Sequence, residues 1–375
     1  MGFSIQQIFR EYGSEYIKMH KLSKEQWKVY NAVINCKTQG LGIHTITCEE
    51  CGETHIALNS CRNRHCPNCQ AYAREKWIEK ESSNLLDCHY FHIVTTIPSE
   101  LNDIVLHNQK ECYDILFKAT SETILELAKD NKWLGAKVGL TSVLHTWGQT
   151  LEFHPHIHSI VTGGGLQNNK WIQSKEEYLF KVQVLSSLFR GKFLAMLKES
   201  DLTFPKDKEY LKNQYEFNKF LEPLYKKIWI TYIEPPKGSP ENVIEYIGRY
   251  SFRVAISNER IKNISDGKVT FEYKDYKDYK DEGKIKTMTI SAEEFIRRFL
   301  LHVLPNRFTK IRHYGILSNR NKSTIIKLCR ILIGTIVNYD FSINIKRKLK
   351  EFVCPCCGGK SFLYKFHYIT EHRLY

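Results

Sequence analysis

Three histidines alternate with other residues in one short stretch of the chain. His154, His156 and His158 fall in the segment 151–163, in which apolar residues continue beyond the last histidine. Because successive side chains of a β-strand point to opposite faces, a strand here would project all three imidazoles from one side. Two neutral imidazoles one strand repeat apart begin a divalent metal site. The simpler alternative is a half-exposed strand, with polar histidines facing water and Ile157 facing the core.

Two tyrosines further along the chain offer nucleophiles. A Ser-Pro-Glu sequence at 239–241 predicts the start of a helix, with an N-cap, a proline in the first turn and an acid near the positive end. A helix turns about 100° per residue, so Tyr246 and Tyr250 share a face, with Arg249 and Arg253 beside them. We interpret this edge as two phenols between two guanidinium groups that can hold DNA phosphates. Alternatively, the tyrosines only extend the apolar stripe of the helix.

The order of these motifs resembles that of the HUH (His-hydrophobe-His) single-strand DNA nucleases. A predicted strand at 90–97, which contains most of the motif stretch 91–98, precedes the histidine strand, and the tyrosine helix follows both. More narrowly, the chain resembles the rolling-circle transposases of the ninety-one family of bacterial insertion sequences, which are related to Helitron transposases and plasmid Rep initiators. The resemblance extends from about residue 20 to about residue 320. The stretches that carry it are 61–70, 145–149, 163–165, 246–250 and 312–315.

The resemblance implies a fold of the α+β class, in which an HUH endonuclease domain has an antiparallel central sheet with flanking helices. In that fold a Glu or Gln on a neighbouring strand commonly completes the metal site. We therefore expect Gln149, at the end of the preceding predicted strand, to join His156 and His158; His154 and Glu152 are its rivals. A mixed set of nitrogen and oxygen donors suits Mg²⁺ or Mn²⁺.

The resemblance also implies a mechanism, metal-assisted transesterification of single-stranded DNA. Tyr246 or Tyr250 would attack a phosphate that the metal polarises, giving a 5′-phosphotyrosine and a free 3′-hydroxyl. A phenol with a pKa near 10 needs such assistance at neutral pH. The expected partners are single-stranded DNA and hairpins at the ends of a mobile element, together with target DNA. Which tyrosine attacks first stays open.

Cysteines and histidines near the N-terminus have the spacing of zinc ligands. Two Cys-x-x-Cys knuckles are separated by fourteen residues, close to the four-thiolate zinc pattern. The first expected zinc site consists of Cys48, Cys51, Cys66 and Cys69. The second consists of Cys36, His44, Cys61 and His65, with His55 as a competing ligand. Few apolar residues lie between these ligands, so metal binding should fold the segment.

A third cluster closes the chain. Cys354 and Cys357 have knuckle spacing, and His367 and His372 follow them. Together they would complete a small zinc finger. The alternative is that Cys356 is a spare thiol and both histidines are solvated. Two or three structural zinc ions are therefore expected.

Composition agrees with a DNA-binding protein. The 375 residues carry a formal net charge of +14, which favours a polyanionic partner, and 21 tyrosines add stacking surface for unpaired bases. The chain has no run of eighteen apolar residues, and its N-terminus lacks the apolar region of a signal peptide. We expect a cytoplasmic protein without membrane contact, whose cysteines are ligands and not disulfides.

The expected organisation has three parts. Residues 1–85 would form a zinc-binding DNA-recognition module and 88–285 the HUH nuclease domain, with a helical insertion at about 174–222. Residues 290–375 would form a basic helical module. The arginines that we expect to contact DNA are Arg62, Arg64, Arg249, Arg253, Arg307 and Arg312.

Two other function classes stay open. A non-catalytic, zinc-dependent DNA-binding regulator would explain the charge and the cysteines, but not the tyrosine pair beside the histidine strand. A zinc-containing nuclease without a covalent intermediate would use the histidines and leave the tyrosines idle.

Overall fold

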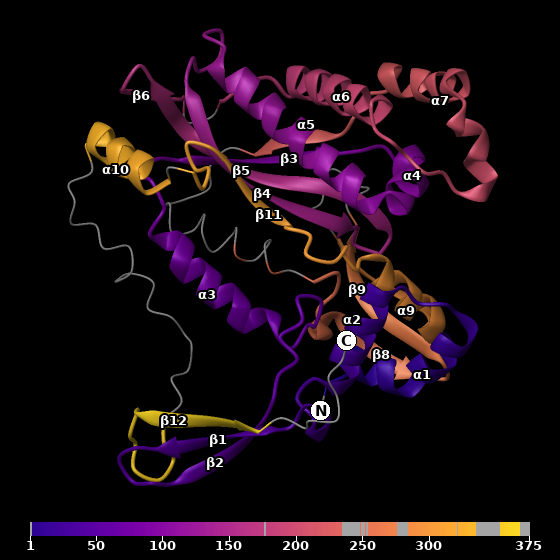
Figure 1. Cartoon of the computed structure of the whole chain (residues 1–375), viewed down its shortest axis with the longest axis vertical. Helices are drawn as coiled ribbons and strands as arrows, with labels where there is room; N and C mark the ends of the chain where they lie inside the picture. The colour runs from indigo at the N-terminus through magenta and orange to yellow at the C-terminus, as the bar shows by residue number, and fades with distance from the viewer. Residues whose placement is uncertain are drawn as a thin grey trace.

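The structure of the chain is a computed structural model that describes residues 2–175, 178–234, 248, 252, 254–275, 284–320, 322–334 and 353–367. Over these residues the strands form three antiparallel sheets with helices packed against them, so the fold is mixed α+β as expected (Figure 1). No helix within these ranges is long and apolar enough to cross a membrane.

The largest sheet has the strand order β11-β4-β5-β3-β7, and β6 pairs with β5 outside this path. All of its pairings are antiparallel. β4 and β5 form a central hairpin, and the buried side chains on one of its faces pack against helices. The strands are β3 (Tyr90–Thr96), β4 (Lys137–Trp147), β5 (Phe153–Gln167), β6 (Lys170–Gln173), β7 (Thr231–Glu234) and β11 (Ile311–Gly315).

Helices cover one face of this sheet (Figure 1). Leu144 of β4 and Ile157 of β5 belong to a buried cluster that also contains Phe117, Phe189 and Leu221 from the covering helices. Since side chains alternate along a strand, the histidines on either side of Ile157 point to the opposite face. The covering helices are α4 (Asn102–His107), α5 (Gln109–Lys129), α6 (Val182–Lys198) and α7 (Gln214–Lys226).

A second core joins the N-terminal helices to residues 255–303. Phe9 of the first helix meets Phe299 edge to face, with ring centroids 5.2 Å apart. Serines at 4, 23 and 291 cap the three helices of this core by accepting backbone N–H groups of the first turn. The elements are α1 (Ile5–Met19), α2 (Lys24–Asn35), α9 (Ala292–Leu301) and the sheet β8 (Ile261–Ser265), β9 (Lys268–Asp275), β10 (Lys284–Ser291).

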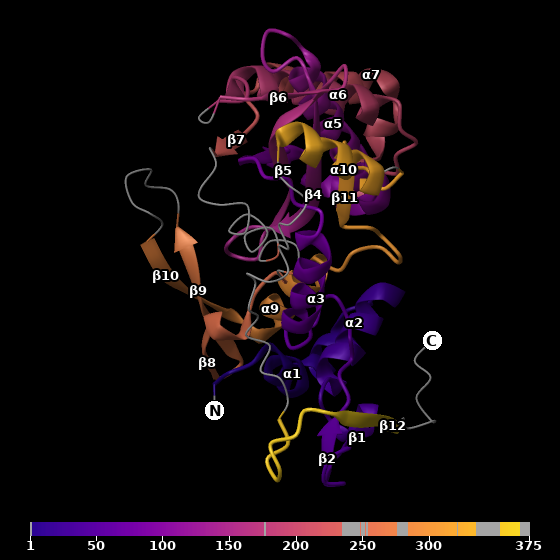
Figure 2. The same ribbon diagram turned by 90° about the vertical axis from the view of Figure 1, so that its left-hand side faces the viewer.

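A small three-stranded ribbon lies at the opposite end of the molecule from α6 and α7 (Figure 1 and Figure 2). It consists of β1 (Ile43–Cys48), β2 (Thr54–Leu58) and β12 (Phe362–His367), in the order β12-β1-β2. Helix α3 (Gln70–Ser82) runs from the vicinity of α2 toward the central sheet (Figure 1). The remaining helices are η1 (Gln39–Leu41), η2 (Ser99–Leu101), η3 (Lys206–Lys212), η4 (Asn258–Arg260) and α10 (Lys322–Ile333).

The region 290–375 is not the separate helical module that the sequence suggested. Its α9 packs on α1, its β11 pairs with β4, and its β12 pairs with β1. Likewise, β8–β10 belong to the core of α1 and α9 and not to the central sheet, although 88–285 was expected to be one nuclease domain. For β11 and β12 the reason is that strands of five and six residues carry little sequence signal, and their partners are distant in the chain.

Candidate active site and zinc sites

Three histidines of the central sheet converge on one point. His145 from β4 and His156 and His158 from β5 each place a ligand nitrogen within 4.8 Å of the others. His156 Nε2 and His158 Nε2 are 3.0 Å apart. His145 pairs directly with His156 across the hairpin, so both side chains share a face with His158. His145 is buried while the other two are half-buried, which leaves one side of the group open to a substrate.

Neighbouring groups orient these rings. The indole of Trp147 stacks on His145, with centroids 4.7 Å apart and an angle of 22° between the planes. The Nδ1 of His156 lies 2.7 Å from the carbonyl oxygen of His154, to which it donates. A proton on Nδ1 leaves the lone pair on Nε2, so His156 is prepared to bind a metal through Nε2.

The third histidine of this group is His145, in a place where Gln149 was expected to complete the site. Strand β4 ends at Trp147, and Gln149 lies beyond it in the turn, where its backbone carbonyl accepts a hydrogen bond from Arg260 at 2.6 Å. The register of the β4–β5 pair determines which residue lies beside His156, and that residue is His145. The rival Glu152 is exposed in the same turn.

His154, the other rival, is also outside the group of three. Its ring centroid is 5.2 Å from that of His156, and burial lowers the pKa of His154. Three imidazole nitrogens are a different donor set from the expected mixture of nitrogen and oxygen. Imidazole suits first-row transition metals, whereas Mg²⁺ prefers oxygen donors. The three nitrogens therefore fit a divalent transition-metal ion better than Mg²⁺.

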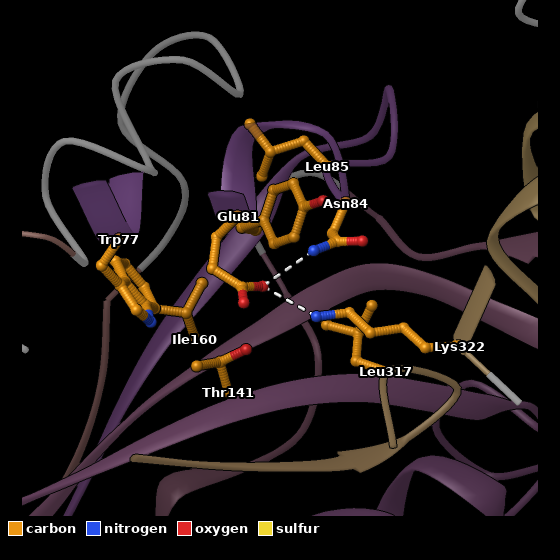
Figure 3. A pocket seen from close by; sticks show the side chains of 9 residues that line it. Trp77, Glu81, Asn84, Leu85, Thr141, Ile160, Leu317 and Lys322 are labelled. Carbon is orange, nitrogen blue, oxygen red and sulfur yellow. Dashed lines mark hydrogen bonds and ion pairs between the residues drawn. The ribbon is translucent and has the colours of Figure 1, made fainter. Parts of the chain in front are cut away.

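A small pocket lies further along the same sheet face (Figure 3). Thr141 and Ile160, a directly paired couple on this face, form its floor, and Trp77 and Glu81 of α3 form its wall. The Glu81 carboxylate is 2.7 Å from the ammonium group of Lys322 on α10. Burial alone would raise the pKa of Glu81, but the hydrogen bond and charge of Lys322 bring the pKa below its usual value. This ion pair joins α3 to α10.

The expected nucleophiles, Tyr246 and Tyr250, lie outside the described residues. The same is true of Arg249 and Arg253, which were expected to hold DNA phosphates. Gly248, between the tyrosines in sequence, is a buried helical residue, and a Cβ there would lie 2.5 Å from the Cδ1 of Ile78 on α3. The N–H of Phe252 donates to the Gly248 carbonyl at 3.2 Å. The Phe252 ring lies 5.9 Å from the Trp77 ring, which also lines the pocket. Both described residues of this segment thus pack on α3.

Eight cysteines form two clusters of four. The first cluster lies where α2 ends and α3 begins, and Cys69 is 3.5 Å from Cys36 and 3.6 Å from Cys61, measured between sulfurs. The second cluster lies at the ribbon, where Cys48 is 3.6 Å from Cys357. Four convergent thiols are a closed, tetrahedral zinc site of the structural type. The clusters are Cys36, Cys61, Cys66, Cys69 and Cys48, Cys51, Cys354, Cys357.

This grouping corrects all three expected zinc sites. The knuckle 48/51 is completed by the knuckle 354/357, because β12 pairs with β1 and places Cys48 opposite Phe362. The expected histidine ligands are replaced by cysteines: His44 Nδ1 contacts the Asn59 side chain at 3.0 Å, and His65 Nε2 lies 3.4 Å from the backbone nitrogen of Leu304. His367 is exposed at the end of β12, and His372 lies outside the described residues. The competing ligand His55 is in neither cluster.

Four of the six arginines expected to bind DNA are among the described residues, and they divide into two groups. Arg64 donates to the backbone carbonyl of Pro305 at 2.9 Å, and Arg312 forms an ion pair with Asp114 and lies over the Phe117 ring. Both therefore stabilise the fold. Arg62 and Arg307 are exposed, so they face any ligand that approaches from solvent.

Comparison with known proteins finds relatives over most of the chain. A family model described as "Transposase zinc-binding domain" matches residues 8–97, and one described as "Putative transposase" matches residues 139–324. A "Putative transposase y4qJ" of Sinorhizobium fredii is 45% identical over 340 residues, which cover 89% of this chain and 85% of that protein. The "Transposase for insertion sequence element IS801" of Pseudomonas savastanoi pv. phaseolicola is 27% identical over 299 residues, covering 77% of this chain and 69% of that protein. No solved structure matches.

The two family matches coincide with the clusters described above. The zinc-binding match contains six of the eight clustered cysteines, so structural zinc is a property of this part of the chain. The transposase match contains all three converging histidines. The family that the order of the motifs indicated is thereby confirmed: the chain belongs to the IS91 family of insertion-sequence transposases.

Proposed function

We propose that this transposase nicks and rejoins single-stranded DNA by HUH-type transesterification, and so mobilises an insertion sequence by a rolling-circle-like route. The observation that carries the proposal is the convergence of His145, His156 and His158 on one face of an antiparallel sheet. A divalent cation held by these nitrogens would polarise the scissile phosphate and stabilise charge on the leaving oxygen.

The chain supplies the nucleophile from its tyrosine segment. The phenol oxygen of Tyr246 or Tyr250 bonds to phosphorus as the phenol proton is lost, and the bond from phosphorus to the 3′ oxygen breaks. The 3′ oxygen takes up a proton, leaving a 3′-hydroxyl and a 5′-phosphotyrosine. This bond keeps the phosphodiester energy for rejoining, so no nucleotide hydrolysis is needed. Two tyrosines allow one to hold the first strand end while the other cuts again.

The position of α3 supports this use of the tyrosines. Gly248, two residues from each tyrosine in sequence, packs on Ile78, and Phe252 packs on Trp77. Trp77 shares a pocket with Thr141 and Ile160, which lie on the sheet face of the histidines.

We further infer that the parts outside the central sheet recognise the DNA. The net charge of +14 favours binding to phosphates. Arg62 is exposed next to a cysteine of the first cluster, and Arg307 is exposed between α9 and β11. The zinc-bearing N-terminal region would bind element ends as hairpins or short single strands, while target DNA enters at the histidines.

The test is a search for a covalent adduct. The zinc-loaded protein is incubated with end-labelled single-stranded DNA and Mn²⁺, then denatured and separated by electrophoresis. We expect labelled protein with wild type and none with His156→Ala, which should still fold and bind DNA. A strand that is bound but uncut would instead indicate a DNA-binding regulator, and cleavage without an adduct would indicate a nuclease that uses water.

A further inference from the structure

We propose that His92 and Glu234 form a positioning relay behind the metal ligand His158. This inference rests on the proposed function, since it assumes that His158 binds a catalytic cation. Strand β3 lies between β5 and β7 in the central sheet. Val94 of β3 pairs with His158, so His92 lies one strand repeat further along the same face, and Glu234 of β7 pairs directly with His92.

The three side chains are close enough for a hydrogen-bonded chain. His158 Nδ1 lies 2.9 Å from His92 Nε2, and the two rings are parallel, with an interplanar angle of 1° and centroids 5.1 Å apart. His92 Nδ1 lies 3.4 Å from a carboxylate oxygen of Glu234. The side chains of His92 and Glu234 are only 9% and 16% exposed, so their polar contacts are shielded from water. Burying such groups is unfavourable unless they are hydrogen-bonded to one another.

The carboxylate gives the chain a direction. An ionised carboxylate only accepts hydrogen bonds, so Glu234 favours the His92 tautomer with its proton on Nδ1. The His92 Nε2 then carries a lone pair and accepts the Nδ1–H of His158. His158 consequently presents the lone pair of its Nε2, which is the nitrogen that lies 3.0 Å from His156 Nε2. The relay thus fixes both the tautomer and the ring orientation of His158.

His156 reaches the same state by a different route. Its Nδ1 donates to the carbonyl oxygen of His154 within its own strand. For His158, the corresponding place is taken by a side chain of the neighbouring strand. Outer partners of metal-bound histidines typically change metal affinity by about 10–100-fold when they are removed. His92 and Glu234 are therefore positioning residues, and their effect should appear in cation binding even without DNA.

The test measures Mn²⁺ affinity of the full-length, zinc-loaded protein by titration calorimetry or by the electron paramagnetic resonance signal of free Mn²⁺. His92→Phe keeps a planar ring but cannot accept from His158, and we expect its affinity to be about 10–100-fold weaker. His92→Gln retains an oxygen acceptor and should recover part of the loss. The matched control is His313→Phe, because His313 is similarly buried, 11% exposed, on the same sheet face but contacts Thr141. Equal Mn²⁺ affinity of wild type and His92→Phe would overturn the relay.

A double variant separates a relay from two independent effects. Glu234→Ala should weaken Mn²⁺ binding less than His92→Phe, and the combined variant should be no weaker than His92→Phe alone, since Glu234 acts only through His92. Additive losses would contradict the relay. His158→Ala tests the premise that His158 binds the cation. If this variant binds Mn²⁺ as well as wild type, the proposed metal site itself is wrong. If only His92→Phe has no effect, the metal site stands and the relay falls.

Discussion

His145 and His156 face each other as a directly paired couple across the β4–β5 hairpin, with ring centroids 5.5 Å apart and planes at 89°. An antiparallel pair brings opposite side chains to about 5 Å at Cβ, so two histidines in register can direct ring nitrogens at one point. His158, one strand repeat further, completes the group. The hairpin register therefore determines which side chains meet at the site. It places His145, and not Gln149, opposite His156.

Replacing His145 by alanine should abolish Mn²⁺-dependent nicking, with a loss of at least about 100-fold, because two imidazoles alone hold the cation weakly. Adduct formation on a single-stranded oligonucleotide measures this. Gln149→Ala is the matched control and should keep near wild-type activity, since Gln149 contributes its backbone carbonyl to Arg260. Activity that survives in His145→Ala and disappears in Gln149→Ala would restore the oxygen-donor site.

Replacing Cys354 by serine should lower the zinc content from two ions per chain to one. Its cluster joins the turn after β1 to the segment before β12, so loss of the ion should also release β12 from β1. Metal analysis and the rate of proteolysis of the C-terminal segment report the two effects. Cys356→Ser, a change at an exposed thiol outside both clusters, should leave two zinc ions bound.

The sequence predicted the histidine strand because alternation is a local signal. β5 does run through 154–158 and places His156 and His158 on one face. His145 was not among the expected ligands, since its position depends on which residue of β4 lies opposite His156. Two sequence signals pointed to it: His145 begins the stretch 145–149 that carries the family resemblance, and it lies in the adjacent predicted strand.

The zinc ligands show a similar limit. All eight clustered cysteines except Cys36 and Cys61 belong to Cys-x-x-Cys knuckles, so the residue types were recognisable. Grouping the knuckles into zinc sites by their distance in sequence gave wrong groups. Cys51 and Cys354 are 303 residues apart in sequence, but their sulfurs are 3.7 Å apart. The C-terminal knuckle held a clue, because its two thiols need two further ligands to complete a zinc site.

The free energy of unfolding should decrease as the pH is lowered, because of His302. Burial lowers the pKa of His302 to about 4, and only its contact with the Leu151 carbonyl opposes this. The unfolded chain takes up a proton near pH 6.5 and the folded chain only near pH 4, so the free energy of unfolding decreases as the pH falls through that window. The loss attributable to this residue is about 3 kcal/mol at most. Denaturant titrations at pH 7, 6 and 5 measure it.

His302→Gln is the comparison for that titration. An amide can keep the contacts to Thr146 and to the Leu151 carbonyl without titrating. The decrease between pH 7 and pH 5 should therefore be smaller in the variant than in wild type. Identical slopes in the two proteins would show that His302 titrates in the folded state as it does in water.

A methyl group at Gly248 should disturb the packing on α3. The Cβ of Gly248→Ala would lie 2.5 Å from Ile78 Cδ1, and Ile78 is buried, so the clash should cost about 1–3 kcal/mol of stability. Adduct formation should fall with it if the tyrosine segment depends on this contact. Ile78→Ala in the same chain removes the obstructing atoms, so the double variant should be more stable than the sum of the two single changes predicts. Strict additivity would contradict the contact.

The two tyrosines should divide the covalent steps. Tyr246→Phe and Tyr250→Phe should each impair complete transposition, because two strand cuts require two covalent holders, and at least one single variant should still form an adduct on a simple oligonucleotide. The double variant should form none. Tyr314→Phe is the matched control: burial raises the pKa of Tyr314, which makes its phenol a poor nucleophile, so its loss should leave adduct formation intact. Peptide mapping of the adduct identifies the attacking residue, and DNA attached to Tyr314, or to any tyrosine other than Tyr246 and Tyr250, would refute the proposed active site.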